Sequence, residues 1–207
     1  MYARTTIIQG DPARIDAGIA HVRDQIFPAV TAMTGGAGMS LLVQRANGRC
    51  IATTAWESEA ALKASAEPVR ALRASAEQVF GAGTSVVDAW EVAAMHRDHP
   101  TGEGACAVVT WLRADPSNTD RAIDVYKMAV LPKYEELDGF CSASMLINRQ
   151  TGRRVGTIIF DSSQALAAGR DAIARIREAG VQESGSTVED VAEMELAFAH
   201  LHVPEMA

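Results

Sequence analysis

The chain has 207 residues, of which 48% are hydrophobic and 22% charged, as in one large or two small globular domains. Its net charge of −7 argues against nucleic acid as a partner, because such proteins need a basic surface to displace counterions. The sequence contains no apolar run near the roughly 20 residues of a membrane helix and no signal-peptide core, so we expect a cytoplasmic protein that contacts no membrane.

The first predicted elements are a strand and a helix. Residues 2–9 form a short segment of β-favouring residues, which predicts a strand. Asp11 then suits a helix N-cap, and Pro12 suits the first helical position, where its missing N–H costs nothing. An apolar face at helical spacing predicts a helix that Pro28 ends or kinks. That face consists of Ile15, Ile19, Val22 and Ile26.

A hairpin, a second helix and a final strand follow. Residues 39–56 read as a hairpin, with Asn47-Gly48 as a two-residue turn. Residues 58–79 read as a helix with Ser58 as its cap, although Pro68 is a local conflict that can break it. Residues 85–96 read as a strand. The resulting order, β-α-β-β-α-β, is the ferredoxin-like split.

The whole unit occurs twice, at an offset of 104 residues. Asp11-Pro12 corresponds to Asp115-Pro116, and the Arg-x-x-Gly-Arg run that begins at Arg45 recurs at Arg149. We therefore predict a first repeat over residues 1–96, a linker over 97–105 and a second repeat over 106–207. Helices cover only one face of such a sheet, so we expect an α+β fold in which two antiparallel sheets pack face to face into one intrachain barrel. The protein would be a monomer or a homodimer.

Two segments carry a family resemblance. Gly35–Leu62 and Gly139–Leu166, with the strand endings "DAWEVA" and "AEMELA", resemble antibiotic-biosynthesis monooxygenases of the dimeric α+β barrel superfamily, here in tandem. The resemblance implies a small apolar organic ligand between sheet and helices. It also implies monooxygenation of an aromatic or polycyclic substrate without a cofactor. The alternatives are a non-catalytic ligand-binding or interaction protein that lost the site, and a lactone or enol isomerase.

The chain departs from the haem-degrading branch of this family. In that branch the functional residues are an Asn on strand 1, a Trp at the end of strand 3 and a His on helix 2. The matching positions hold Thr6 and Thr110, Trp56 and Phe160, and Ser65 and Gly169. A haem iron needs an axial ligand such as His, so this departure argues against haem degradation.

Four aromatic residues are the candidate ligand-binding residues: Trp56, Phe160, Trp111 and Tyr126. Trp56 lies on a predicted apolar face of the sheet and offers a flat wall to an aromatic ligand. Trp111 and Tyr126 replace Ile7 and Val22 of the first repeat, so the repeats have diverged where a pocket can form. The alternative is that these residues are ordinary core.

Glu91 and Glu195 are the candidate catalytic residues. They are mid-strand carboxylates at equivalent positions of the two repeats. A half-buried Glu can have a raised pKa and act as a general base. The alternative is an ion pair with an arginine such as Arg49 or Arg153.

The cysteines and histidines predict no metal site. Cys50, Cys106 and Cys141 form no CxxC pattern and read as small buried residues of a reducing compartment. A bis-histidine site is conceivable near the repeat ends, but no ligand shell with zinc-like spacing surrounds it, so we expect exposed histidines. These are His96, His99, His200 and His202. His21, beside the first helix's apolar face, reads as a surface or rim residue.

Overall fold

The chain folds into two compact units, and each contains residues from both halves of the sequence. The computed structural model describes residues 1–206. Unit 1 contains Met1–Glu91 and Glu195–Val203, and unit 2 contains Val92–Met194 and the residues from Pro204 onward. The long strands β4 (Ser85–Arg97) and β8 (Thr187–Leu201) therefore each begin in one unit and end in the other.

The strands form an antiparallel barrel. Hydrogen bonds join them in the closed order β1-β3-β2-β8-β5-β7-β6-β4. This order confirms the α+β class and the intrachain barrel that the tandem repeat predicts.

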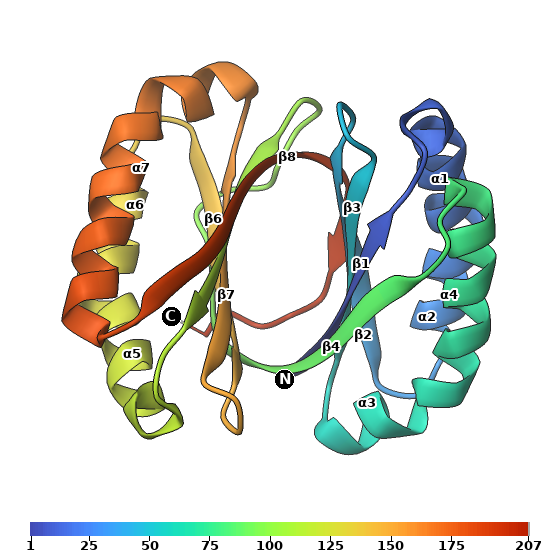
Figure 1. The fold of residues 1–207 in the computed structure, drawn as a ribbon, viewed down its shortest axis with the longest axis horizontal. Helices are drawn as coiled ribbons and strands as arrows, with labels where there is room; N and C mark the ends of the chain where they lie inside the picture. The colour runs from blue at the N-terminus through green and yellow to red at the C-terminus, as the bar shows by residue number, and fades with distance from the viewer. Residues whose placement is uncertain (207) are drawn as a thin grey trace. The chain divides into compact units, whose positions relative to one another are not determined.

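Unit 1 packs its helices on one face of its sheet (Figure 1). A core cluster that includes Ile8, Leu41, Trp56 and Phe80 fills the space between them. The strands are β1 (Tyr2–Gln9), β2 (Gly36–Gln44) and β3 (Arg49–Trp56). The helices are α1 (Ile15–His21), α2 (Phe27–Thr31), α3 (Glu59–Ala64) and α4 (Ala66–Phe80).

Unit 2 repeats the arrangement (Figure 1). Its core cluster includes Val108, Phe140, Phe160 and Ile173. The strands are β5 (Cys106–Arg113), β6 (Phe140–Asn148) and β7 (Arg153–Phe160). The helices are α5 (Thr119–Val125), α6 (Leu131–Glu135) and α7 (Ser163–Ser184).

The predicted helix starts are confirmed, whereas the helix does not end at Pro28. The side chains of Asp11 and Ser58 accept hydrogen bonds from Ala13 N and Ala61 N. Pro28 does not end its helix, because a π-helical turn, η2 (Val22–Ile26), precedes it and α2 then continues. Short 3-10 turns precede α1 and α5, and a second π-helical turn precedes α6. They are η1 (Pro12–Arg14), η3 (Pro116–Asn118) and η4 (Tyr126–Val130).

The second helix of the first repeat is broken, whereas its equivalent in the second repeat is continuous. α3 ends at Ala64 and α4 begins at Ala66, so Pro68 lies in the first turn of a new helix, where its ring is tolerated. Ala172 takes the place of Pro68 in α7, which runs unbroken from Ser163 to Ser184.

The predicted two-residue turn at Asn47-Gly48 is wrong. Gln44 pairs with Arg49, so the turn has four residues, Arg45–Gly48. Gly48 has φ +77°, and its amide donates to Gln44 O at 2.9 Å, which closes the longer turn. The register differs from the predicted one by two residues, so the same side chains still face the helices. Trp56 lies on that face, as predicted.

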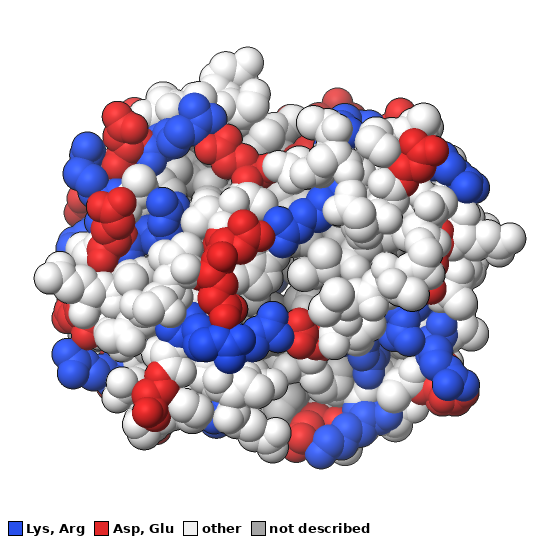
Figure 2. All heavy atoms as spheres, in the orientation of Figure 1, with Lys and Arg blue, Asp and Glu red and all other residues white. Residues whose placement is uncertain are grey.

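The surface carries mixed charges. On the face that Figure 2 shows, basic and acidic side chains are interspersed among uncharged ones. Exposed ion pairs include Arg170 with Glu193, whose Nε and Oε1 atoms lie 2.7 Å apart. Among residues 1–206, no helix has both the length and the apolar character needed to cross a bilayer.

Candidate functional site

Unit 2 contains a cavity between its sheet and its helices. The cavity has about 60 Å3 of volume accessible to water, several times the roughly 10–15 Å3 that one water molecule needs. It is well below the roughly 300 Å3 of a typical drug-sized site. Residues of β5, β6 and β7 form its floor, and residues of α5, η4, α6 and α7 form its roof. The wall is mostly apolar, with Val125, Met145 and Ile158 among its members.

The cavity lies where a serine replaces a buried phenylalanine of the first repeat. In unit 1, Phe80 is completely buried, and its ring packs so closely on Gly18 that a Cβ there would lie 2.1 Å from it. The equivalent of Phe80 in the second repeat is Ser184, which lines the cavity. A phenyl ring therefore fills in unit 1 the space that remains open in unit 2.

A buried arginine forms one wall of the cavity. Arg154 is 1% exposed, and it occupies the β7 position that Cys50 occupies in β3. Its Nη1 donates to Ser186 Oγ at 2.8 Å, and Ser186 Oγ in turn lies 2.8 Å from Ser184 Oγ. Its Nε and Nη2 have no hydrogen-bond partner among the described residues. Burial lowers the pKa of Arg154, but a guanidinium stays charged in a protein.

Two tyrosines line the opposite side. Tyr126 donates to Ser144 O at 3.3 Å, and burial raises its pKa, to which the nearby Tyr134 adds. Burial raises the pKa of Tyr134 to about 12. Arg177 also lines the cavity, and none of the described lining residues is acidic. The cavity therefore combines neutral phenols with positive charge.

The aromatic candidates lie in different places. Of the four predicted ligand-binding residues, Tyr126 lines the cavity. Trp111 neighbours the lining residue Thr110 on β5, so its side chain points to the other sheet face. Phe160 is completely buried and packs edge-on against Phe140, with ring centroids 6.4 Å apart.

Trp56 belongs to a buried polar cluster in unit 1. Its Nε1 donates to Thr54 Oγ1 at 3.0 Å, and the Arg4 guanidinium lies 5.7 Å from the centre of its ring. Arg4 Nη1 donates to Ser65 Oγ at 3.0 Å, and Nη2 donates to Leu62 O at 2.6 Å. Trp56 thus contacts a hydrogen-bonded arginine rather than an open space. Burial and the charge of Arg73 lower the pKa of Arg4.

The predicted catalytic carboxylates lie outside the cavity. Glu195 accepts two hydrogen bonds from Arg45, at 2.7 and 3.0 Å, within unit 1. This arginine is neither of the two that the sequence suggested. Glu91 lies on β4 opposite Tyr2 of β1 and is partly buried.

The histidines take part in several contacts. His96 Nδ1 lies 2.8 Å from Glu205, and His200 Nε2 lies 3.1 Å from His202 Nε2. His21 Nε2 lies 2.7 Å from Ser75 Oγ.

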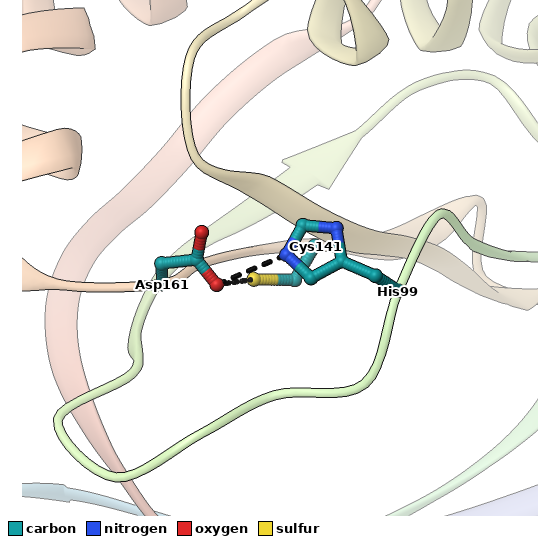
Figure 3. A group of neighbouring side chains, drawn as sticks. All are labelled: His99, Cys141 and Asp161. Atoms are coloured by element: carbon teal, nitrogen blue, oxygen red, sulfur yellow. Dashed lines mark hydrogen bonds and ion pairs between the residues drawn. The ribbon is translucent and has the colours of Figure 1, made fainter.

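His99 meets Cys141 and Asp161 in unit 2 (Figure 3). Hydrogen bonds to Asp98 and Asp161 raise the pKa of His99. Hydrogen bonds from His99 and Cys141 lower the pKa of Asp161. Burial, helped by Asp161, raises the pKa of the Cys141 thiol to about 12.

Sequence reasoning missed Arg154 and the His99 cluster. The repeat alignment matched Arg153 with Arg49 and so drew attention to the neighbour of Arg154. A usable signal was present. Side chains alternate between the two faces of a strand, and Arg154 lies six residues before Phe160, so it shares the face that Phe160 was expected to turn to the helices. The Cys141 contacts depend on a bulge and a loop that no sequence pattern predicts.

Comparison with known proteins gives a close relative and several fold neighbours. The chain is 48% identical over 206 residues to the uncharacterized protein Rv2557 of Mycobacterium tuberculosis, and the match covers all of this chain and 92% of that protein. No family model matches the chain.

Two solved structures share the fold over nearly the whole chain. A proposed monooxygenase from Lactobacillus acidophilus has a TM-score of 0.70 at 8% identity, covering 97% of this chain and 96% of its own. An anthrone oxidase-like protein has a TM-score of 0.67 at 16% identity, covering 100% and 94%. The fold is therefore that of monooxygenase-like ferredoxin-fold proteins, as the sequence resemblance implied, and a shared fold leaves the function open.

Proposed function

We propose that this chain, which belongs to the family of the Mycobacterium tuberculosis protein Rv2557, binds a small organic anion in the cavity of unit 2. The observation that carries the proposal is Arg154, a buried cation with two unpartnered nitrogens at the cavity wall. A carboxylate or similar oxyanion would accept hydrogen bonds from these nitrogens, and an arginine fork suits such groups.

Energetics support an anionic ligand. An unpaired buried charge lowers the stability of a fold by several kcal/mol. A fold that keeps such a charge is therefore expected to use it in binding. Residues of similar volume without charge would fill the position at lower cost, and Cys50 shows that the equivalent position in unit 1 accepts a neutral side chain. Arg177 at the same wall adds positive potential. An oxyanion would offset both charges.

The size of the cavity limits the ligand. About 60 Å3 holds a carboxylate head group with a few carbon atoms, whereas a dry cavity that binds benzene has about 150 Å3. Val125 and Ile158 offer apolar contact to the ligand's remainder. A polycyclic molecule would need the helices to move away from the sheet. We therefore favour a short-chain carboxylate over the aromatic or polycyclic ligand that the family resemblance implied.

The test uses short carboxylates and their uncharged amides. Propionate at constant ionic strength is expected to raise the midpoint of thermal unfolding of the purified protein, with an increase that grows with concentration. Propionamide has nearly the same shape and is expected to give a much smaller shift. The Arg154→Gln variant is expected to lose the response to propionate, because the guanidinium is the anion's partner.

A matched control comes from the adjacent residue. Arg153 lies next to Arg154 on β7 but points to the opposite face. Its Nε lies 3.8 Å from Glu189 Oε2. Arg153→Gln makes the same change of charge and should keep the propionate response. Equal shifts by propionate and propionamide, or a full response in Arg154→Gln, would overturn the proposal.

Cofactor-independent monooxygenation is the second candidate function, and the buried guanidinium favours it. In such a reaction the deprotonated substrate reduces O2 itself, so a CH2 group becomes a carbonyl and the other oxygen atom leaves as water. Arg154 would stabilise the enolate or phenolate that forms first. Oxygen uptake with an anthrone or a quinol tests it. Glu91→Gln and Glu195→Gln test the base that the sequence suggested, although both carboxylates lie outside the cavity. Uptake no faster than without protein would reject this function and leave anion binding standing.

A further inference from the structure

We propose that His99, Cys141 and Asp161 of unit 2 form a binding site for a zinc-like divalent metal ion (Figure 3). His99 follows β4, Cys141 lies in β6, and Asp161 follows β7 directly. The three residues offer an imidazole, a thiol and a carboxylate, the ligand types that zinc takes in proteins. This inference is independent of the cavity and of its ligand.

The geometry suits a small ion. The three ligand atoms lie within 4.8 Å of one another. His99 Nε2 lies 3.0 Å from Asp161 Oδ1, and Cys141 Sγ lies 3.1 Å from the same oxygen. Zinc bonds of about 2.0–2.3 Å in a tetrahedral arrangement separate ligand atoms by roughly 3.3–3.6 Å. The two separations from Asp161 Oδ1 are therefore within about 0.6 Å of those in a tetrahedral zinc site.

The backbone assembles the cluster before any ion binds. Cys141 is the extra residue of a β-bulge between Phe140 and Ser142, and bulges re-aim side chains. Cys141 O accepts from Asp98 N at 2.9 Å and from His99 N at 3.4 Å, which fixes the loop beside the bulge. Asp161 N donates to Gly139 O at 2.9 Å. Main-chain hydrogen bonds thus hold all three ligands at one end of strands β4, β6 and β7.

A second carboxylate orients the histidine. Asp98 Oδ2 lies 2.8 Å from His99 Nδ1, so Nε2 is the nitrogen that faces Cys141 and Asp161. Metal-binding histidines commonly donate their other ring N–H to a carboxylate in this way. Cys141 is buried, His99 is half-buried and Asp161 is exposed. A fourth position therefore faces solvent, where water can complete the coordination.

A nucleophilic cysteine is a weaker interpretation of the same cluster. In a cysteine–histidine pair the imidazole takes the thiol proton, which requires the two groups to be hydrogen-bonded. Here Cys141 Sγ donates to Asp161 instead, and His99 bonds the same carboxylate oxygen. The sulfur, nitrogen and oxygen atoms all lie within 4.8 Å of one another, which is close enough to share one ion.

Unit 1 shows that the fold does not require this cluster. The positions equivalent to His99, Cys141 and Asp161 are Val203, Ala37 and Glu57. The main-chain frame is nevertheless the same, since His202 N donates to Ala37 O at 2.8 Å. Unit 2 thus places histidine and cysteine on a main-chain frame that both units share.

The test is metal titration of the chelator-treated, reduced protein. Co2+ is expected to bind with a stoichiometry of one and to give a thiolate-to-cobalt charge-transfer band, and Zn2+ is expected to displace it. Cys141→Ser should remove the band. His99→Gln should weaken binding at least tenfold, and Asp98→Asn should weaken it about 10–100-fold, because orienting partners have effects of that size.

Two sets of controls separate this site from others. Cys50→Ser and Cys106→Ser should keep the band. His200→Gln with His202→Gln removes the paired imidazoles of unit 1 and should leave the affinity unchanged. If Cys141→Ser fails to fold, as judged by circular dichroism, Asp161→Asn replaces it and should weaken binding. Absence of the band in the wild type, or loss of binding only in the His200 and His202 variant, would overturn the proposal.

Discussion

Cys50 and Arg154 occupy the same register position of the two sheets. Cys50 pairs with Ile8 on β1, and Arg154 pairs with Leu112, the equivalent residue of β5. Both side chains are 1% exposed or less. One sheet therefore buries a small neutral group exactly where the other buries a cation, and the cost of that cation can be measured.

Replacing Arg154 by methionine is expected to stabilise the protein. The Nε and Nη2 atoms of Arg154 have no partner among the described residues, so their desolvation is not offset. Apolar residues of similar volume in place of buried charges often stabilise by about 1–4 kcal/mol. Urea unfolding of Arg154→Met should show a higher free energy of unfolding, together with loss of the propionate response.

Arg153→Met is the control for this prediction. Its side chain is partly exposed, so its free energy of unfolding should change by no more than about 0.5 kcal/mol. Destabilisation of Arg154→Met by several kcal/mol would identify the guanidinium as a structural group and count against a binding role.

Gly156→Ala is expected to fill part of the cavity without strain. A Cβ at Gly156 has no heavy atom within 4 Å, and the equivalent residue of the first repeat, Ala52, already carries one. Replacing glycine at a compatible position stabilises by about 0.4–1 kcal/mol. Urea unfolding should show this gain, and calorimetry should show weaker propionate binding, because the methyl group takes ligand space.

Gly152→Ala provides the opposite expectation on the same hairpin. Gly152 has φ +69°, and a Cβ there would lie 2.0 Å from Ala114 O, so the variant should be destabilised. If Gly156→Ala loses stability as Gly152→Ala does, the cavity is not open in solution.

Most of the fold could be predicted because its signals are local and repeated. Asp11 and Ser58 cap helices through contacts two or three residues away, which a sequence shows directly. The duplication at offset 104 then implied the barrel, since a sheet with one bare face needs a cover. The turn after Gln44 was mispredicted because two-residue and four-residue turns both suit Asn47-Gly48.

The candidate site could not be predicted in the same way. Arg154 matters because it is buried with two nitrogens, Nε and Nη2, that have no partner among the described residues, and burial depends on packing by helices. The cavity depends on the loss of one ring, Phe80 in the first repeat against Ser184 in the second. That difference is visible in an alignment of the repeats, but its effect on volume is visible only in three dimensions.

Tyr134 is expected to make stability fall at alkaline pH. Burial raises its pKa to about 12 in the folded protein, while an unfolded tyrosine has a pKa of about 10. Between these values the unfolded chain has lost a proton that the folded chain keeps. The contribution of Tyr134 to the free energy of unfolding is therefore fully present below pH 10 and falls as pH rises. The loss by pH 12 is on the order of 2 kcal/mol.

Urea unfolding of wild type and Tyr134→Phe between pH 8 and about 11 tests this expectation. Phenylalanine has no phenolic proton, so the variant should lose less stability as pH rises. Identical pH slopes for the two proteins would contradict the burial of the Tyr134 phenol.

Ser65→Ala is expected to destabilise unit 1. Arg4 Nη1 donates to Ser65 Oγ, and both side chains are buried. Alanine removes the acceptor and leaves a buried charged donor unpaired, which costs about 1–3 kcal/mol. The second repeat supports this account, because Gly169 replaces Ser65 where Val108 replaces Arg4. The buried serine is thus present in the repeat that has the buried arginine and absent from the repeat that lacks it.

Ser163→Ala is the matched control, since Ser163 is exposed at the start of α7 and its loss should change stability by no more than about 0.5 kcal/mol. Urea unfolding of both variants gives the comparison. The Ser65→Ala variant should also keep its propionate response, because Arg4 and Ser65 lie in unit 1 and the cavity lies in unit 2. Equal stability of the two variants would mean that water or another acceptor replaces the serine hydroxyl at Arg4.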